Sequence, residues 1–477
     1  MENNLKSKVL SSLIWKLLER GGTQGIQFLI QIILARMLTP DDYGVIAIIM
    51  IFIALANVFI QSGFNTALIQ KKKTDDIDFS SVFYLSLGVA SILYIILYLT
   101  VPIIANFYKT VELIKILRVL SLTLFLGVFN SIQNTIIIKN MEFKKEFFSS
   151  LIAVFFSGIL GIILAYKNYG VWALVYQQLA NQFLICLILW NIVRWRPKFL
   201  FSLERIRILF AFSGKLLLSS LFDTFYMNIT SLVIGKIYTT SMLGFYNRGN
   251  QFPQLIISNF NGSIQAVIFP ALSAVQEDRN RIKEIVRRSI VTSSYIIFPL
   301  MIGLMIIATP LIKILLTDKW LPCVPYLRIF CLSYALWPIH TANLQAINAV
   351  GRSDIFLKLE IIKKILGLSI LIVSMNYGMY AIAVGVLITG ILSSFINGQP
   401  NKIILNYGYL EQIKDICPSL VLSLVMGCLI YPISMMKLNN LTIIIVQIIL
   451  GVFVYIFLSY ILKLECFIYI VKILKNR

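Results

Sequence analysis

The chain reads IILARMLTPDDYGVI at residues 32–46 and, two hundred residues later, LVIGKIYTTSMLGFY at residues 232–246. The two stretches align without a gap, and apolar positions face apolar positions. A cation, a threonine and a glycine recur in register: Arg36 and Lys236, Thr39 and Thr239, Gly44 and Gly244. Each stretch ends a long apolar run, turns, and enters the next run through the glycine. The pattern predicts one helix–turn–helix that occurs twice, as in a duplicated membrane protein.

The composition indicates a lipid environment. Of the 477 residues, 58% are hydrophobic and 13% are charged, and the mean hydropathy is +0.85. A soluble domain is about half apolar and about a quarter charged. The sequence does not open with a short apolar segment and a small-residue cleavage site, so we expect no removable signal peptide.

The charge and the cysteines narrow the functional class further. The net charge of +21 could indicate nucleic acid, but membrane proteins concentrate Lys and Arg in cytoplasmic loops, which is the simpler interpretation. The six cysteines form no CxxC pair. We therefore expect no disulfide framework, no metal site and no cofactor.

Fourteen segments are long and apolar enough to span a membrane, for which about 20 residues are needed. With the N-terminus inside, 28 Lys and Arg residues fall in inner loops and 10 in outer loops. This asymmetry predicts that both termini are cytoplasmic. The predicted spans are 10–35, 43–63, 81–104, 114–137, 147–166, 170–192, 208–235, 251–274, 290–312, 325–349, 359–376, 379–398, 416–436 and 441–462.

The spans group into six, six and two helices. We expect an all-α polytopic membrane protein with two pseudo-symmetric six-helix lobes, residues 1–195 and 196–400, and two further helices in residues 401–477. The repeated stretches are an even number of helices apart. The two lobes are therefore expected to be parallel repeats with a cleft between their first helices. Chance similarity of two apolar helices is the alternative interpretation.

Charges inside the predicted spans are the candidate site residues. In the first span, Lys16, Glu19 and Arg20 are spaced to share one helix face. In the seventh, Lys215 and Asp223 lie two turns apart. Charge within a bilayer is costly and normally faces water or a partner. The cations are expected to line a cavity for an anionic substrate. Glu19 and Asp223 are candidates for coupling to an ion or proton.

Other interpretations compete at several of these positions. Lys16 and Lys215 lie near the inner boundary, where a long side chain can reach the interface instead. Arg248 follows the seventh span and could approach the cavity, or belong to a loop. His340, the single histidine, could relay protons or be packed and neutral. The basic run at residues 279–288 is expected to lie along the anionic inner leaflet.

Several stretches together resemble the lipid-linked oligosaccharide flippases, the polysaccharide exporters of the Wzx type. They are LARMLTPDDYGVIAI and NTALIQKKK in the first half, then LGFYNRGNQFPQLIISNFNGSIQAVIFPALSAVQEDRNRIKEIVRRS, KWLPCVPYLRIFCL and INAVGRSDIFLKLEIIKKILG. The resemblance covers roughly residues 5–400. This group belongs to the MOP superfamily, with the MATE drug exporters and the lipid II flippases, and the chain is most similar to exporters of colanic and teichuronic acid.

The resemblance implies a V-shaped, MATE-like fold of two lobes around a central cavity. It implies an undecaprenyl-diphosphate-linked oligosaccharide as cargo, flipped across the bacterial inner membrane by alternating access for surface polysaccharide export, as for capsule, exopolysaccharide or O-antigen of lipopolysaccharide. A polymerase and a chain-length regulator are possible partners. In related flippases, cations on the first helix line the cavity; by helix and depth, Lys16 and Arg20 are the matching positions here.

Two other functions remain open from the sequence. A MATE-like exporter of cationic drugs should have an acidic, aromatic site, whereas the charges within these spans are mostly basic. A membrane polymerase or ligase of the same pathway should have a sizeable outer loop, and the outer loops here are short. We find no catalytic constellation and no Walker A motif. We therefore expect a transporter and not an enzyme.

Overall fold

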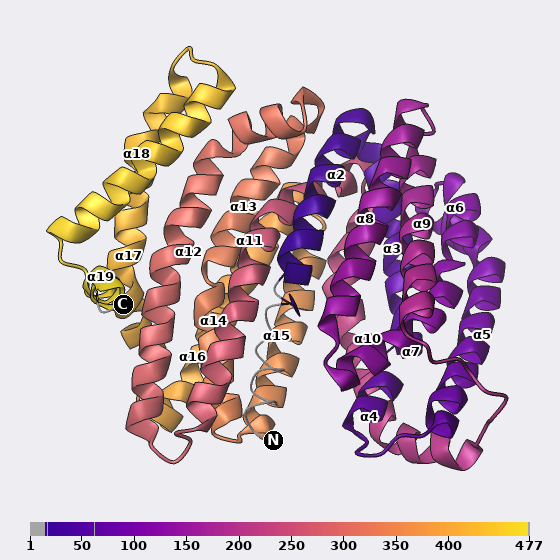
Figure 1. Cartoon of the computed structure of the whole chain (residues 1–477). Coiled ribbons are helices and arrows are strands. Elements are labelled where there is room, and N and C mark those ends of the chain that lie inside the picture. Colours follow the sequence, from indigo (N-terminus) through magenta and orange to yellow (C-terminus); the bar gives the residue numbers. More distant parts are fainter. Residues whose placement is uncertain (1–14, 17, 62, 476–477) are drawn as a thin grey trace. The chain divides into compact units, whose positions relative to one another are not determined.

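The computed structural model describes residues 15, 16, 18–61 and 63–475, and every regular element in these residues is a helix (Figure 1). The chain divides into two units, residues 1–244 and 245–477, each packed within itself. The all-α fold class is therefore confirmed. The division into lobes that end at residues 195 and 400 stays a prediction.

In the described residues, the first unit contains ten helices up to residue 237, together with residues 32–46 and 232–244 of the repeated stretches. The helix α8 packs on α2 and α9, and α10 packs on α3 and α5. The bounds are η1 Glu19–Thr23, α2 Gln24–Met37, α3 Pro40–Gln61, α4 Phe64–Gln70, α5 Asp76–Tyr108, α6 Glu112–Leu120, α7 Thr123–Asn140, α8 Phe143–Tyr166, α9 Val171–Ile192 and α10 Leu203–Ile237. The next helix, α11, covers Thr240–Ser273 and begins in this unit.

The second unit contains the remainder of α11 and the C-terminal helices. Its centre is α12, which packs on α13, α17 and α18. The Tyr295 hydroxyl donates to Ser459 Oγ at 2.9 Å, which joins α12 to α18. The bounds are α12 Arg279–Leu315, η2 Asp318–Cys323, α13 Val324–Ala335, α14 Trp337–Ala349, α15 Ser353–Ser374, α16 Met379–Leu405, α17 Tyr409–Ile430, η3 Tyr431–Met435, α18 Asn440–Ile461 and α19 Glu465–Lys475.

Nine helical segments among the described residues are long and apolar enough to cross a membrane. They correspond to nine of the fourteen predicted spans, so a multi-pass membrane protein is supported and the count of fourteen stays a prediction. The first predicted span lies partly outside the described residues. Two others are interrupted, one between α6 and α7 and one between α13 and α14. The two remaining predicted spans, 251–274 and 359–376, correspond to the polar helix α11 and the charged helix α15.

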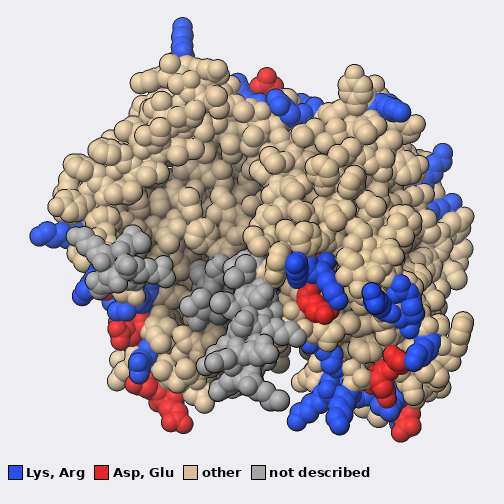
Figure 2. Space-filling model, in the orientation of Figure 1, with Lys and Arg blue, Asp and Glu red and all other residues tan. Residues whose placement is uncertain are grey.

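The surface has the apolar character that a bilayer requires. Figure 2 shows that uncharged side chains form most of the visible face. Exposed apolar side chains recur along helices of both units; Leu99 and Ile103 of α5 and Ile449 and Phe453 of α18 are each more than half exposed. Such continuous exposed apolar surface marks contact with lipid.

The two repeated stretches adopt the same helix–turn–helix, as predicted. The first turn joins α2 to α3 and the second joins α10 to α11, and in each turn the residue after the first helix, Leu38 or Tyr238, is extended. In the first turn Thr39 Oγ1 accepts a hydrogen bond from the backbone N–H of Asp42 at 3.2 Å. In the second, Thr239 Oγ1 accepts one from Met242 at 3.2 Å. The recurring threonines therefore cap the helices that follow them.

The recurring glycines bring the two turns into contact within the first unit. A Cβ on Gly44 would lie 1.8 Å from the carbonyl oxygen of Thr240, and a Cβ on Gly244 would lie 2.1 Å from that of Pro40. Real Cβ atoms do not approach an oxygen so closely, so neither position accepts a side chain without movement of the backbone. The hydroxyl of Thr240 also donates to Asp41 Oδ1.

Lys236, the aligned cation of the second repeated stretch, contacts α5 at the same end of the unit. Lys236 Nζ donates to the carbonyl oxygen of Phe107 at 2.7 Å and lies 3.9 Å from the centre of its ring. Cations over aromatic rings are typical of interface anchors. This contact agrees with a structural role for Lys236 and not with a place in a substrate site.

A buried carboxylate joins several elements at the opposite end of the first unit. Asp78, in the first turn of α5, is fully buried and accepts from Lys71 Nζ at 2.6 and 2.7 Å. Arg205 Nη1, at the start of α10, lies 3.4 Å from Asp78 Oδ1. Asp78 also closes a capping box with Asp75. One side chain therefore joins the α4–α5 loop, α5 and α10.

We expect the substitution Asp78→Ala to destabilise the protein by about 3 kcal/mol, because it leaves two cations without their buried partner. This value is at the lower end of the range for broken buried pairs, since Lys71 is 30% and Arg205 40% exposed. Thermal unfolding of the purified protein in detergent measures the change.

The matched control for this substitution is Asp76→Ala, two residues earlier on the same helix. Asp76 pairs with Lys198 at 2.6 Å, but the two side chains are 43% and 61% exposed. An exposed pair contributes only about 0–1 kcal/mol. Equal losses in the two variants would show that burial of Asp78 does not strengthen its role.

Candidate functional site

Lys16, the first candidate cation, lies between two carboxylates. Its Nζ is 3.2 Å from Glu19 Oε2 and 2.9 Å from Glu146 Oε1 of α8, and it lies 5.5 Å from the centre of the Phe143 ring. The three charged side chains are partly buried, at 33%, 18% and 17% exposed. Lys16 is therefore neutralised within the protein, and it fixes the first helical turns to α8.

The segment that follows Lys16 has an irregular helical geometry. Residues Glu19–Thr23 form a π-helical turn that contains Gly21 and Gly22. Single π turns are rare and occur frequently at functional sites. The structure does not describe the side chain of Arg20, so its role as a cavity cation stays a prediction. A Cβ on Gly21 would meet no atom within 4 Å, so this turn has an open side.

A polar helix face continues from this turn along α2, and our sequence interpretation missed it. Gln24 and Gln27 are exposed and Gln31 is partly buried. Their spacing of three and four residues places the three amides on one face of the helix. The same spacing within an apolar run was visible in the sequence. Amides at membrane depth face water or polar partners, because lipid offers no hydrogen bonds.

The central part of α10 has a similar polar face. No side chain between residues 214 and 233 is buried, although this segment is apolar enough to span a membrane. Lys215, Ser219 and Asp223 are exposed and lie four residues apart, on one face of the helix. Exposed charge in the middle of a spanning helix has to face a hydrated space. This placement favours the cavity interpretation for Lys215 and Asp223.

Arg248, the fourth candidate cation, is packed inside the second unit. Its side chain is 4% exposed. Nη1 donates to Gln251 Oε1 at 2.5 Å, and the guanidinium lies 5.1 Å from the centre of the Trp320 ring. These contacts join α11 to η2. The contact of Arg248 with substrate stays a prediction, and the observed packing gives it a structural role as well.

The described part of the chain contains no candidate metal centre. No group of three His, Cys, Asp or Glu side chains there could hold a metal ion. His340 Nδ1 lies 3.1 Å from Asn397 Nδ2. This contact joins α14 to α16 and agrees with a packing role for the histidine.

The basic run at residues 279–288 forms the first turns of α12 and is not a separate surface segment. Its cations pair with carboxylates of other helices: Lys283 with Glu411 at 3.1 Å, and Arg287 with Asp415 at 3.0 Å. Arg287 also binds Glu465 of α19 at 3.0 Å. These contacts link α12, α17 and α19, and they leave fewer free cations for lipid than the sequence alone indicates.

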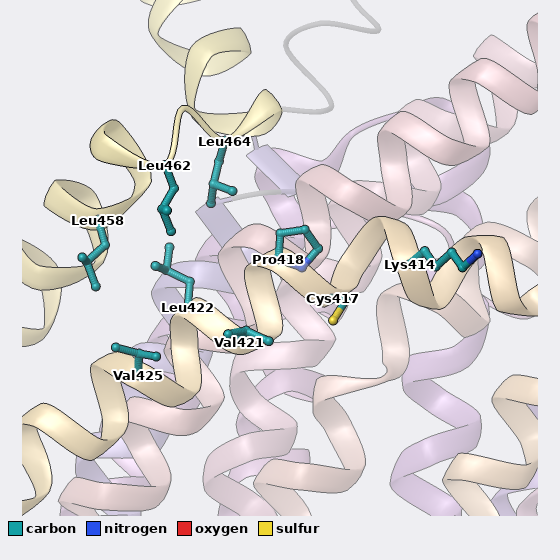
Figure 3. Close-up of a pocket in the computed structure, with 9 residues that line it drawn as sticks. All are labelled: Lys414, Cys417, Pro418, Val421, Leu422, Val425, Leu458, Leu462 and Leu464. Atoms are coloured by element: carbon teal, nitrogen blue, oxygen red, sulfur yellow. The ribbon is translucent and has the colours of Figure 1, made fainter.

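An apolar pocket of about 550 Å³ lies between α17 and α18 in the second unit (Figure 3). Leucines of α18 and the turn after it point toward the apolar side chains of α17, and Lys414 lies at one end of the pocket. Apart from Lys414, such a wall offers little hydrogen bonding for a sugar, and it suits a hydrocarbon chain. The lining residues are Lys414, Cys417, Pro418, Val421, Leu422, Val425, Leu458, Leu462 and Leu464.

These features define an all-helical, multi-pass membrane protein with polar and charged faces on spanning helices. Residues 33–325 match the family model described as polysaccharide biosynthesis protein. That match covers more than half of the sequence, and the chain belongs to this family. The resemblance inferred from the sequence motifs is therefore confirmed.

Two curated relatives cover most of the chain. The succinoglycan biosynthesis transport protein ExoT of Rhizobium meliloti is 24% identical over 341 residues, which are 72% of this chain and 69% of that protein. The teichuronic acid biosynthesis protein TuaB of Bacillus subtilis is 24% identical over 358 residues, 74% of this chain and 73% of that protein.

Solved structures show the same fold. The lipid II flippase MurJ, in an inward closed conformation, aligns with a TM-score of 0.75 at 18% identity and covers 95% of this chain and 98% of its own. An inward-facing multidrug resistance transporter of the MATE family aligns with a TM-score of 0.58 at 17% identity, covering 83% of this chain and 95% of its own. At this identity the likeness shows the MOP-superfamily fold alone.

Proposed function

We propose that the protein is a flippase for an undecaprenyl-diphosphate-linked oligosaccharide. It moves this repeat unit across the bacterial inner membrane by alternating access, for export of a surface polysaccharide. The observation that carries the proposal is the family match over residues 33–325, in a chain with the fold of a lipid flippase. ExoT is by its name a transport protein of polysaccharide biosynthesis, which supports the same class of cargo.

The polar helix faces provide a physical basis for this activity. A diphosphate cannot enter hydrocarbon without compensation for its lost hydration. Cations at Arg20 and Lys215 would bind the diphosphate, and the amides at Gln24, Gln27 and Gln31 would bind hydroxyl groups of the sugar. The lipid tail would stay in apolar surroundings. Asp223 and Glu19 are the proposed carboxylates for ion or proton coupling.

The proposal includes a topology. Fourteen spanning helices place both termini in the cytoplasm, and this orientation follows from the excess of Lys and Arg in the predicted inner loops. The protein acts as a secondary transporter and not as an enzyme. A polymerase and a chain-length regulator would receive the flipped repeat unit on the outer side.

Transport of a fluorescent undecaprenyl-diphosphate oligosaccharide into the far leaflet of proteoliposomes tests the function directly. We expect faster flipping with the protein than in protein-free vesicles, and restored polymer export in a host that lacks its own exporter. Flipping no faster than in empty vesicles, together with failure to restore export, would contradict the proposal. Drug resistance in an efflux-deficient host would instead identify a MATE-like antiporter, and glycosyl transfer by the purified protein would identify a polymerase or ligase.

A further inference from the structure

A second pocket in the second unit has a chemistry that the proposed transport does not use. It encloses about 280 Å³ at the C-terminal end of α12, beside α13, η3 and the start of α18. Unlike the pocket between α17 and α18, its wall combines two cations with hydroxyl and amide groups. The polar lining consists of Thr309, Lys313, Arg328, Tyr431, Ser434 and Asn440.

Arg328 is held in a defined orientation beside this pocket. Its Nε donates to the carbonyl oxygen of Met305 at 3.3 Å, and Nη2 donates to Thr309 Oγ1 at 3.2 Å. No carboxylate in the described ranges forms an ion pair with it. A guanidinium has five N–H donors, so these two bonds leave donors for a ligand. Its planar fork matches the oxygens of a phosphate.

Lys313 provides the second positive charge. Its only ion-pair partner in the described part of the chain is Asp318, at 3.9 Å. The Asp318 side chain is 80% exposed, so water screens this weak pair. Two cations that share a pocket of this size repel each other unless an anion lies between them. The arrangement therefore favours a bound anion.

The N-terminus of α18 is a third feature that favours a bound anion. Asn440 is the first residue of this helix and lines the pocket, and the side chain of the capping residue Asn439 forms no hydrogen bond to the first turn. The first backbone N–H groups of a helix carry a partial positive charge and bind anions. Ser434 Oγ accepts from Gln447 at 2.7 Å, which leaves its own hydroxyl hydrogen to donate.

The rest of the wall is apolar. Ile306, Pro310, Met435 and Ile443 line it, and Met435 is 73% exposed. The volume of about 280 Å³ is just below the roughly 300–1,000 Å³ of ordinary ligand pockets and is too small for an oligosaccharide. A small anionic group attached to an apolar body fits both halves of the wall.

We propose that this pocket binds the phosphate of an anionic lipid headgroup. Arg328 and Lys313 hold the phosphate oxygens, the start of α18 donates from a third side, and the apolar wall contacts the glycerol and the upper acyl chains. No residue of α2 or α10 lines this pocket, and the site does not depend on the proposed cargo. Free phosphate shares the chemistry of the headgroup, and the experiment has to distinguish these two sources.

Lipid binding to the delipidated full-length protein tests the proposal. Phosphatidylglycerol is added in mixed micelles, and bound lipid is counted by native mass spectrometry and followed by the shift in Tm. Diacylglycerol, which has the same acyl chains and no phosphate, is the negative arm; inorganic phosphate is the competitor. We expect phosphatidylglycerol to bind and diacylglycerol not to bind. Binding that inorganic phosphate does not displace identifies a lipid headgroup, and full displacement identifies a site for free phosphate.

The variant Lys313→Gln/Arg328→Gln should bind phosphatidylglycerol at least about tenfold more weakly, since charge-assisted hydrogen bonds are lost. Lys358→Gln/Lys472→Gln changes the net charge equally at exposed positions of the same unit and should bind as the unmodified protein does. If the double variant does not fold, Arg328→Lys replaces it as the test. This substitution keeps the charge, loses the planar guanidinium, and should also weaken the binding of phosphatidylglycerol. Equal binding of diacylglycerol, unchanged binding by both pocket variants, or an equal loss in the control would overturn the proposal.

Discussion

The variant Gly44→Val is expected to lose about 3 kcal/mol of stability or more, because overpacking at a rigid contact forces the backbone apart. A Cβ at this position would lie 1.8 Å from the carbonyl oxygen of Thr240. No rotamer relieves this overlap, since the clash involves Cβ and a backbone atom. Gly244→Val should have a comparable effect through the carbonyl of Pro40. Thermal unfolding in detergent and the yield of monodisperse protein measure both changes.

Gly88→Val is the matched control for this experiment. Gly88 lies within α5, and a Cβ there would meet no atom within 4 Å. The same change of side chain in a helix should therefore cost well under about 1 kcal/mol. If Gly44→Val and Gly88→Val unfold at the same temperature, the glycine contact between the two turns does not contribute to stability.

The double variant Arg20→Ala/Lys215→Ala is expected to abolish export while the protein remains folded. Each charge-assisted hydrogen bond to a phosphate is worth about 1.5–3 kcal/mol, so the loss of two should weaken cargo binding by at least about a hundredfold. Lys215 is exposed on α10 and so contributes little to packing. Polymer export in cells and flipping in proteoliposomes measure the effect. The variant Arg20→Lys/Lys215→Arg, which keeps both charges, should keep much of the export activity.

The control for this variant removes one cation from the last turn of α2, the helix that follows the η1 turn of Arg20, and one from the last turn of α10. Arg36 ends α2 and Lys236 ends α10, and Lys236 binds the carbonyl oxygen of Phe107. Arg36→Ala/Lys236→Ala should keep most of the export activity. Export by the Arg20→Ala/Lys215→Ala variant at the level of this control would show that the cavity lies elsewhere.

The helix–turn–helix repeat could be predicted from the sequence because its determinants are local. Thr39 and Thr239 act through hydrogen bonds to residues three positions later, and apolar runs mark the flanking helices. The interruption between α6 and α7 was not predicted, since no glycine or proline occurs at residues 120–123. The spacing of the three amides on α2 was visible in the sequence, but the predicted site residues were limited to charged side chains.

Contacts between residues far apart in the sequence limit how much of the candidate site can be predicted from the sequence. Lys16 meets Glu146 across 130 positions of the chain, and no periodicity in the sequence reveals such a pair. Lys215 and Lys16 had the same sequence argument, yet one is exposed and the other is paired with two carboxylates. Burial of Arg248 beside Trp320 likewise depends on packing between helices. Sequence identifies the charges, and tertiary structure decides which of them are available.

The reciprocal contact of the two turns has the form of an isologous interface. Position 44 touches residue 240 and position 244 touches residue 40, as corresponding residues do across the two-fold axis of a homodimer. A single copy of this segment that paired with a second copy would make the same contact twice. In a homodimer, one mutation necessarily alters both sides of the interface. Here the two sides are encoded separately, so each can be changed alone and the symmetry of the contact can be measured directly.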